Sequence, residues 1–352
     1  MGVWYATREQ VKSALDVQET ARNNTQIDRA LETGSRSIEA LCHRRFYPQQ
    51  DTRSWDWPNA QGAASWRLWL DDNELISLTS LTSGGTAIPL EHVLLEPNRS
   101  GPPFNRIELN IGTSAAFGGG STHQQDITGS GLFGYRNDET LLGSTLEALD
   151  AAETGVDVDS LTSAAVGVGS VLRIDSERMF VTGRTQLATG QTLGADLGAL
   201  AKDVTVSVQS GAAFTVDEVI LIEGERMRII DIAANTLIVK RGWDGSVLAA
   251  HTAGAGIYAP RSLTVQRGAL GTTAAASSIG AAVARWDPPG PVQTLAVAEA
   301  INTLVLETAG YSRVQRSGDG ATSERARDLR GIEGLRAQVY TAYGRKARTR
   351  GV

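Results

Sequence analysis

The four histidines are the first side chains to test for chemistry, because an imidazole can bind a metal or act as a general base. They are His43, His92, His123 and His251, and no two of them have the spacing of a zinc-binding helix or hairpin. His43 lies where a helix is expected to end, His123 in a polar loop and His251 in a repeated segment. The sequence therefore predicts no metal site built on histidine.

The other groups that could do chemistry have ordinary structural explanations. Cys42 is the only cysteine, and the neighbouring His43 points elsewhere on a helix, so a buried thiol is expected rather than a nucleophile. Gly118-Gly119-Gly120 lacks the Lys-Ser/Thr of a phosphate-binding loop and predicts a flexible loop. Acidic positions that could bind a weak calcium ion, but fit turns or strand edges better, are Asp71, Asp72, Asp157 and Asp159. We expect no catalytic residue, no metal, no cofactor and no enzymatic activity.

Composition narrows the class of protein further. The chain has 352 residues, a formal net charge of −6 and a single cysteine. The acidic balance argues against a general nucleic-acid coat, and one cysteine excludes an intrachain disulfide. No apolar run is long enough to span a membrane, and the first residues lack the pattern of a signal peptide. A protein made and assembled in a cytoplasm is expected.

Helices are expected near both ends of the chain. Thr7 and Gln10 have the spacing of a capping box. A longer helix is predicted to begin after Thr25 as its N-cap and to end near residues 43–45, with Gly34 permitting close packing. Residues 292–309 predict a helix that is apolar on most sides, and a last helix carries Tyr340 and Tyr343. Between them, residues 52–111 predict short strands joined by turns.

The middle of the chain contains an internal repeat. Residues 157–183 resemble residues 205–231, and both copies contain Glu-Arg-Met. Residues 236–242 resemble residues 262–268. Each repeat therefore has a first half (residues 157–183 or 205–231) and a second half (residues 236–242 or 262–268). Both first halves precede both second halves, whereas in a tandem array each first half would be followed by its own second half. This order indicates either one β unit nested inside a loop of its twin or two units that exchange strands.

Three segments carry a resemblance to a known family. They are residues 28–47, which end in Arg44-Arg45-Phe46-Tyr47, residues 68–81, and residues 127–135. In this order they resemble the head–tail connector proteins of tailed bacteriophages, which form a ring beneath the portal. In that family a Pro-rich turn and a third helix follow the last strand at once, whereas here they begin only at Pro288-Pro289.

The resemblance implies an α+β fold with a helical-bundle connector core. That core would comprise residues 1–136 and 287–352, and residues 137–286 would be a β-rich insertion domain containing two related units in a nested repeat. The implied function is that of a structural virion protein, a head–tail adaptor at the neck that links the capsid to the tail. The implied partners are other copies in a ring of twelve, the portal protein, a head-closure (stopper) or tail-terminator protein, and DNA passing through the channel; no membrane partner is expected.

Two sets of residues would serve this function. The apolar helix would pack within the ring through Val292, Leu295, Ile301, Leu304 and Val305. The C-terminal segment would contact the portal through Tyr340, Tyr343, Arg345, Lys346, Arg348 and Arg350. For the basic residues two alternatives stay open, contact with DNA phosphates in the channel and a solvated tail without a partner.

Two rival functions also remain. One is a tail or neck decoration protein whose β repeats bind another virion protein or a host glycan. The other is an enzyme whose active site shows no familiar pattern.

Overall fold

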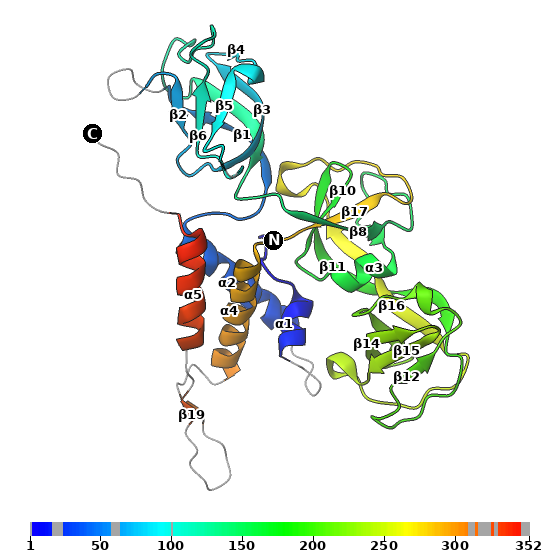
Figure 1. Cartoon of the computed structure of the whole chain (residues 1–352). Helices are drawn as coiled ribbons and strands as arrows, with labels where there is room; N and C mark the ends of the chain where they lie inside the picture. Colours follow the sequence, from blue (N-terminus) through cyan, green and yellow to red (C-terminus); the bar gives the residue numbers. More distant parts are fainter. Residues whose placement is uncertain are drawn as a thin grey trace. The chain divides into compact units, whose positions relative to one another are not determined.

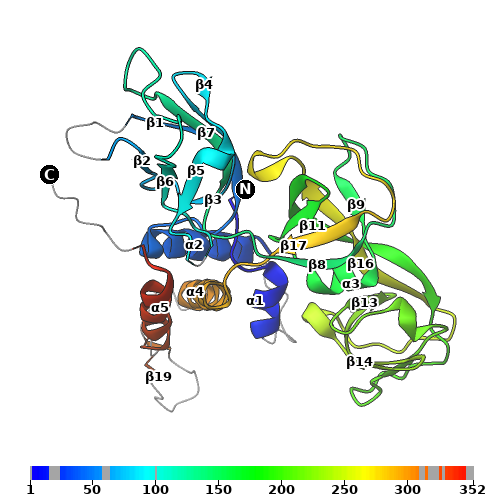
Figure 2. The same cartoon turned by 45° about the horizontal axis from the view of Figure 1, so that its top comes forward.

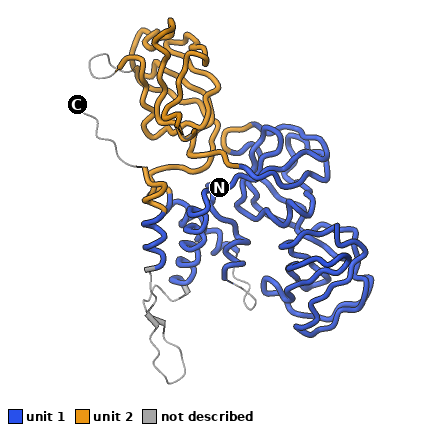
Figure 3. Tube along the Cα trace, in the orientation of Figure 1, with its two compact units in different colours: residues 1–38, 139–269, 273–338 blue, residues 39–138, 270–272, 339–352 orange. Residues whose placement is uncertain are grey.

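The structure is a computed structural model that describes residues 2–15, 24–57, 64–99, 101–308, 314–315, 325–326 and 330–345. The chain divides into two compact units, shown in Figure 3. Unit 1 comprises residues 1–38, 139–269 and 273–338, and unit 2 comprises residues 39–138, 270–272 and 339–352. Each unit is therefore assembled from segments that lie far apart in the sequence.

Four helices come from the two ends of the chain: α1 (Arg8–Ala14), α2 (Asn24–Cys42), α4 (Gly290–Thr308) and α5 (Arg330–Tyr343). Figures 1 and 2 show α2, α4 and α5 side by side. A Cβ atom added at Gly34 of α2 would lie 3.1 Å from Cβ of Glu299 in α4, so the close packing predicted at this glycine is confirmed. Arg336 of α5 holds the buried Glu299 carboxylate through two hydrogen bonds of 2.5 and 2.9 Å.

The capping box at the start of α1 is confirmed. The Thr7 hydroxyl accepts from the backbone N–H of Gln10 at 3.2 Å, and the Gln10 side chain accepts from the backbone N–H of Thr7 at 2.9 Å. The prediction of Thr25 as an N-cap is wrong, because α2 already includes Asn24.

Unit 2 is built mainly from short antiparallel strands. Their bounds are β1 (Gln49–Trp55), β2 (Arg67–Trp69), β3 (Leu75–Ser83), β4 (Thr86–Ala87), β5 (Val93–Glu96), β6 (Arg106–Leu109) and β7 (Ile127–Phe133). They form one sheet in the order β1-β7-β3-β4 and another in the order β2-β6-β5. Alternate residues of β7 are buried, so one face of that strand lies on the core. Trp55, Leu81, Ile107 and Phe133 belong to this core.

The expected helical-bundle core is wrong. Among the described residues, 36% are in strands and 25% in helices. The strands of residues 49–133, although short, bury an apolar core of their own, so they form a β body rather than a small appendage to helices. The strands predicted between residues 52 and 111 are confirmed, as is the turn at Gly84-Gly85, where both φ angles are positive.

Unit 1 contains a ten-stranded antiparallel sheet formed by residues 139–286. Its strands are β8 (Glu139–Ser144), β9 (Gly155–Asp157), β10 (Val171–Ile174), β11 (Glu177–Thr192), β12 (Thr205–Ser207), β13 (Val219–Ile222), β14 (Glu225–Ala233), β15 (Thr236–Lys240), β16 (Gly256–Gln266) and β17 (Ala282–Trp286). The order is β12-β15-β14-β13-β16-β11-β10-β17-β8, with β9 also paired to β16. A short helix, α3 (Ser160–Ala165), follows β9 and is capped by Asp159. Two further short strands, β18 (Val314–Gln315) and β19 (Arg325–Ala326), pair with each other outside this sheet.

The sheet resolves the order of the internal repeat. β14 pairs with the adjacent β15, whereas β11 pairs with the distant β16. The second β unit is therefore nested inside the first. We call residues 193–258 the inner repeat, and residues 139–192 with 259–286 the outer repeat.

Each repeat has its own hydrophobic core, and the two cores match position by position. Met179 and Val181 of the outer core correspond to Met227 and Ile229 of the inner core, 48 residues later. In the second halves, the outer residue lies 26 positions after its inner counterpart, as Leu263 does after Leu237. The pairing Val181↔Val265 is likewise repeated as Ile229↔Val239. The two repeats therefore share one fold.

Strand β16 belongs to both repeats. Its first residues, Ile257 and Tyr258, pair with β13 of the inner repeat, while Ser262–Gln266 pair with β11 of the outer repeat. A buried ion pair between Arg261 of β16 and Glu218, which precedes β13, joins the repeats at this point, with hydrogen bonds of 2.8 and 2.9 Å. Backbone pairing and a buried charge thus make the two repeats one continuous sheet.

Candidate functional site

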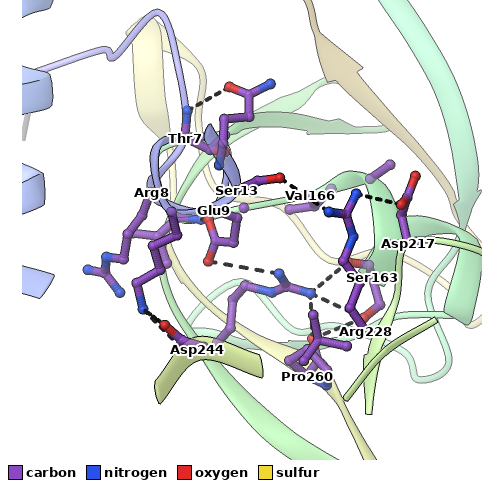
Figure 4. Close-up of a pocket in the computed structure, with 18 of the residues that line it drawn as sticks. Thr7, Arg8, Glu9, Ser13, Ser163, Val166, Asp217, Arg228, Asp244 and Pro260 are labelled. Atoms are coloured by element: carbon purple, nitrogen blue, oxygen red, sulfur yellow. Dashed lines mark hydrogen bonds and ion pairs between the residues drawn. The ribbon is translucent and has the colours of Figure 1, made fainter. Parts of the chain in front are cut away.

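A cavity of about 430 Å³ lies in unit 1, where α1 meets both repeats. Figure 4 shows side chains from α1, from the end of α3 and from the β strands around it. Its polar and charged lining residues are Thr7, Arg8, Glu9, Gln10, Lys12, Ser13, Asn24, Ser163, Arg184, Gln186, Asp217, Arg226, Arg228, Asp244 and Arg285. This volume lies within the range of pockets that hold small ligands.

Helix α1 forms one wall of the cavity because it is bonded to both repeats. Towards the outer repeat, the backbone N–H of Arg8 donates to the carbonyl of Val168 at 3.1 Å, and the Glu9 carboxylate accepts from the N–H of Val168 at 2.8 Å. Towards the inner repeat, Lys12 forms a 2.8 Å ion pair with Asp244. The position of α1 is therefore fixed by backbone and charged contacts.

Basic side chains outnumber acidic ones in the lining. The basic residues are Arg8, Lys12, Arg184, Arg226, Arg228 and Arg285, and the acidic residues are Glu9, Asp217 and Asp244. Most of the cations have a carboxylate partner. Arg228, for example, donates to Asp217 at 2.6 Å, and Arg8 binds Asp28, which lies outside the lining, at 2.6 and 2.8 Å. The positive charge of the lining is thus largely compensated, and the cation that lacks a close carboxylate is the one left to bind a ligand.

Arg184 is the least compensated of these cations. Its side chain is 12% exposed, and Nη2 donates to the carbonyl oxygens of Ser163 and Pro260 at 2.6 and 3.2 Å. The nearest carboxylate oxygen, on Glu9, lies 3.9 Å from Nη1, and the buried Nε has no hydrogen-bond partner among the described residues. Burial lowers the pKa of Arg184, and the charges of Glu9 and Glu218 only partly oppose that shift. A buried guanidinium ordinarily has a hydrogen-bonded anion beside it.

A second set of charges lies inside the repeats. In the inner repeat, Arg241 holds Glu225 through two hydrogen bonds of 2.7 Å, and the backbone N–H groups of Gly242 and Ala249 also donate to this carboxylate. In the outer repeat, Arg267 holds Glu177 in the same way, at 2.8 and 2.7 Å. All four side chains are less than a tenth exposed. Each arginine also donates to backbone carbonyls of neighbouring loops, so the pairs fasten loops to the sheet.

His251 joins the inner pair. Its Nε2 lies 3.0 Å from Glu225 and its Nδ1 lies 2.9 Å from Glu223. Burial by itself would raise the pKa of Glu225, but Arg241, the N–H of Ala249, His251 and the N–H of Gly242 lower it to about 2. Glu225 is therefore ionised across the physiological range of pH.

The predicted portal-contacting residues are only partly described. Tyr340 is 46% exposed, while the Tyr343 ring packs against Phe46 and Tyr135, with centroid distances of 6.1 and 5.8 Å. The backbone N–H of Arg345 donates to the carbonyl of Cys42 at 2.9 Å, and its side chain forms an ion pair with Asp72. Lys346, Arg348 and Arg350 lie outside the described residues.

The residues predicted to pack helix α4 within a ring divide into two groups. Val292, Leu295 and Leu304 are buried inside the chain, whereas Ile301 and Val305 are partly exposed. Packing between subunits through this helix remains a prediction, and only the second group has surface left for it.

The remaining chemical candidates are placed as follows. Cys42 is fully buried, as predicted, and burial raises the pKa of its thiol.

Within the described ranges, no group of three or more His, Cys, Asp or Glu side chains is arranged to hold a metal ion. No helix among these residues is long and apolar enough to cross a membrane. The loop at Gly118–Gly120 is held by Ser83, whose hydroxyl accepts from the N–H of Gly118 at 2.8 Å.

Sequence reasoning missed the cavity and the buried pairs. The buried pairs could have been found in the sequence. Glu177 and Glu225 are polar residues at matching positions of two hydrophobic strands, and Arg241 and Arg267 directly follow two other matching strands. The cavity could not, because its lining comes from segments that only the nested order brings together. Comparison with known proteins finds no matching family model, no matching curated protein and no matching solved structure.

Proposed function

We propose that this chain is a structural head–tail adaptor of a tailed bacteriophage, which forms a ring beneath the portal and leaves a channel for DNA. The observation that carries the proposal is the aromatic cluster of Phe46, Tyr135 and Tyr343. Its ring centroids are 5.5 to 6.1 Å apart, and the guanidinium of Arg44 lies 4.7 Å from the centroid of the Tyr135 ring.

This cluster joins two of the three segments that carry the resemblance to the last helix of the chain. Phe46 comes from the Arg-Arg-Phe-Tyr element and Tyr135 from the segment after β7, while Tyr343 ends α5. Edge-to-face aromatic contacts of this kind stabilise by about 0.5–1.5 kcal/mol each beyond the area that they bury. The start of the basic C-terminal segment (residues 345–352, which we call the arm) is therefore anchored to the fold, as contact of this segment with a neighbouring ring would require.

The ring would be joined to the portal by that arm, where basic side chains can pair with acidic groups of the partner. The excess of acidic residues elsewhere in the chain favours a channel through which DNA slides without adhering. The alternative of a neck or tail decoration protein rests on the repeats, which form a sheet of their own and could bind another virion protein or a host glycan.

A complementation assay tests the proposal. A phage deleted for this gene is grown on cells that supply either the Tyr343→Ala or the Gln338→Ala variant. We expect Tyr343→Ala to give heads without attached tails in electron micrographs and at least a tenfold drop in infectious particles, because the arm loses its anchor. Gln338→Ala, at an exposed position on the same helix and outside the predicted portal contacts, is the matched control for folding.

Heads and tails that join normally in the complete absence of the chain would contradict the adaptor function. A deletion that leaves joined but poorly adsorbing particles would instead support the decoration protein.

A further inference from the structure

The cavity lined by α1 and both repeats has the features of a site for an anion. Buried cations in proteins are paired, because taking a charge out of water without a partner is unfavourable by several kcal/mol. Arg184 lies at this cavity, and the nearest carboxylate oxygen, on Glu9, is 3.9 Å from its Nη1, beyond hydrogen-bonding distance. An anion in the cavity would give Nη1 a partner within hydrogen-bonding distance.

The other cations of the lining show which kind of anion fits. Lys12 and Arg226 share the carboxylate of Asp244, at 2.8 and 3.8 Å, and Arg228 binds the carboxylate of Asp217. The cavity is therefore already organised around carboxylates. Ser13, Gln10 and Gln186 add neutral polar groups that can bond to a peptide backbone.

A nucleotide fits less well. Trp243 is the only aromatic residue among the residues that line the cavity, and two cations already lie over its ring, Arg228 at 5.2 Å and Lys240 at 5.4 Å. A base would have to displace them in order to stack. The volume of about 430 Å³ also exceeds what a single inorganic oxyanion needs.

We propose that this cavity binds an acidic peptide segment of a partner protein, with one of its carboxylates on Arg184. The proposal does not depend on the adaptor function, because it rests on the cavity alone. Two exposed residues of the lining would tune the affinity: the Arg226 side chain is 44% exposed and that of Asp217 is 58% exposed. Arg226 attracts the segment, and Asp217 competes with it for Arg228.

Isothermal titration of the full chain at low salt tests this proposal, with an acetylated and amidated tetraglutamate as the probe. We expect one peptide to bind per chain, and the tetraglutamine analogue to give no heat. The Arg184→Gln variant should bind at least about tenfold more weakly, a loss of about 1.4 kcal/mol, because the glutamine cannot offer a charged partner to the carboxylate. Higher salt should weaken binding to the wild-type chain.

Two surface variants keep the test decisive if Arg184→Gln fails to fold. Arg226→Gln should weaken binding several-fold, and Asp217→Asn should strengthen it several-fold by freeing Arg228. Asparagine suits position 217, where φ is 73°. Absence of tetraglutamate binding, or binding that neither surface variant changes, would overturn the proposal. Orthophosphate that binds with this dependence while tetraglutamate does not would replace the peptide by a phosphate group.

Discussion

The inner and outer repeats surround the same buried carboxylate in different ways. In both repeats a glutamate at the start of a strand accepts two hydrogen bonds from an arginine and two from backbone N–H groups. In the inner repeat His251 adds a further contact to Glu225, whereas the matching position of the outer repeat is Ser277, which bonds to Asp175 instead. The ion pair is therefore the feature that the fold shares, and the histidine is an addition to one copy.

The addition changes the contacts around the buried carboxylate. His251 lies between Glu223 and Glu225, with one ring nitrogen 2.9 Å from Glu223 and the other 3.0 Å from Glu225. Ser277 of the outer repeat bonds to Asp175. The inner repeat thus has one more side-chain contact on its buried carboxylate than its twin.

The largest expected effect comes from removing one buried charge. Glu225→Gln keeps the shape of the side chain but leaves Arg241 without a counter-ion, which should destabilise the inner repeat by about 3–5 kcal/mol. Hydrogen exchange of the amides in β14 and β15 measures this loss. Glu177→Gln should do the same to the outer repeat, by somewhat less, because Arg267 is 7% exposed and Arg241 only 2%.

Glu223→Gln is the matched control for that experiment, since the Glu223 side chain is 58% exposed. It should change exchange by less than about 1 kcal/mol. An equal effect of the Glu223 and Glu225 variants would show that the buried Arg241–Glu225 pair does not stabilise the inner repeat more than an exposed carboxylate does.

Acidification should also act on the buried carboxylates. The pKa of Glu225 is lowered from 4.5 to about 2, so its ionisation stabilises the fold above pH 4.5 and loses this effect as the pH falls from 4.5 towards 2. The loss is on the order of 3 kcal/mol, and exchange protection of β14 measured across this range should report it. The pKa of Glu177 is lowered in the same sense, because Arg267 and two backbone N–H groups outweigh burial. In the Glu225→Gln variant, the part of this loss of exchange protection that is due to Glu225 should be absent. If the pH dependence of exchange in that variant equals that of the wild-type chain, the proposed linkage is wrong.

The smallest effect should come from making the inner repeat resemble the outer one. His251→Ser removes the contacts with Glu223 and Glu225 and should destabilise the inner repeat by about 1–3 kcal/mol near neutral pH. Ser277→Ala, the corresponding deletion at a partly exposed position, should change the outer repeat by less than about 0.5 kcal/mol. Equal exchange rates in the two variants would mean that the histidine adds nothing to the shared ion pair.

The internal repeat could be predicted from the sequence because matching residues recur at a constant spacing along the chain. Hydrophobic residues at constant offsets, such as Met179 and Met227, must occupy matching places if the two segments share a fold. The order of the halves limited the arrangement to nesting or exchange, and only the pairing of β11 with β16 decides for nesting. Local signals such as the capping box at Thr7 were also sufficient, because they depend on a few adjacent residues.

The prediction of a helical-bundle core was wrong. It followed the family resemblance, which stressed the helices, and it underestimated the strands between them. Strands such as β2 and β4 have three and two residues, too few for a clear alternating pattern, yet the strands of unit 2 bury one core together. The cavity could not be predicted either. Arg184 looks like an ordinary strand residue in the sequence, and its lack of a hydrogen-bonded carboxylate becomes visible only when α1 and both repeats are in place.

A cryo-electron microscopy reconstruction of the neck of the intact particle tests the adaptor proposal most directly. We predict a ring of this chain directly beneath the portal, with the segment after Arg345 against the portal and Ile301 and Val305 at the contact between subunits. Density for the chain further down the tail or on the outside of the particle would contradict it.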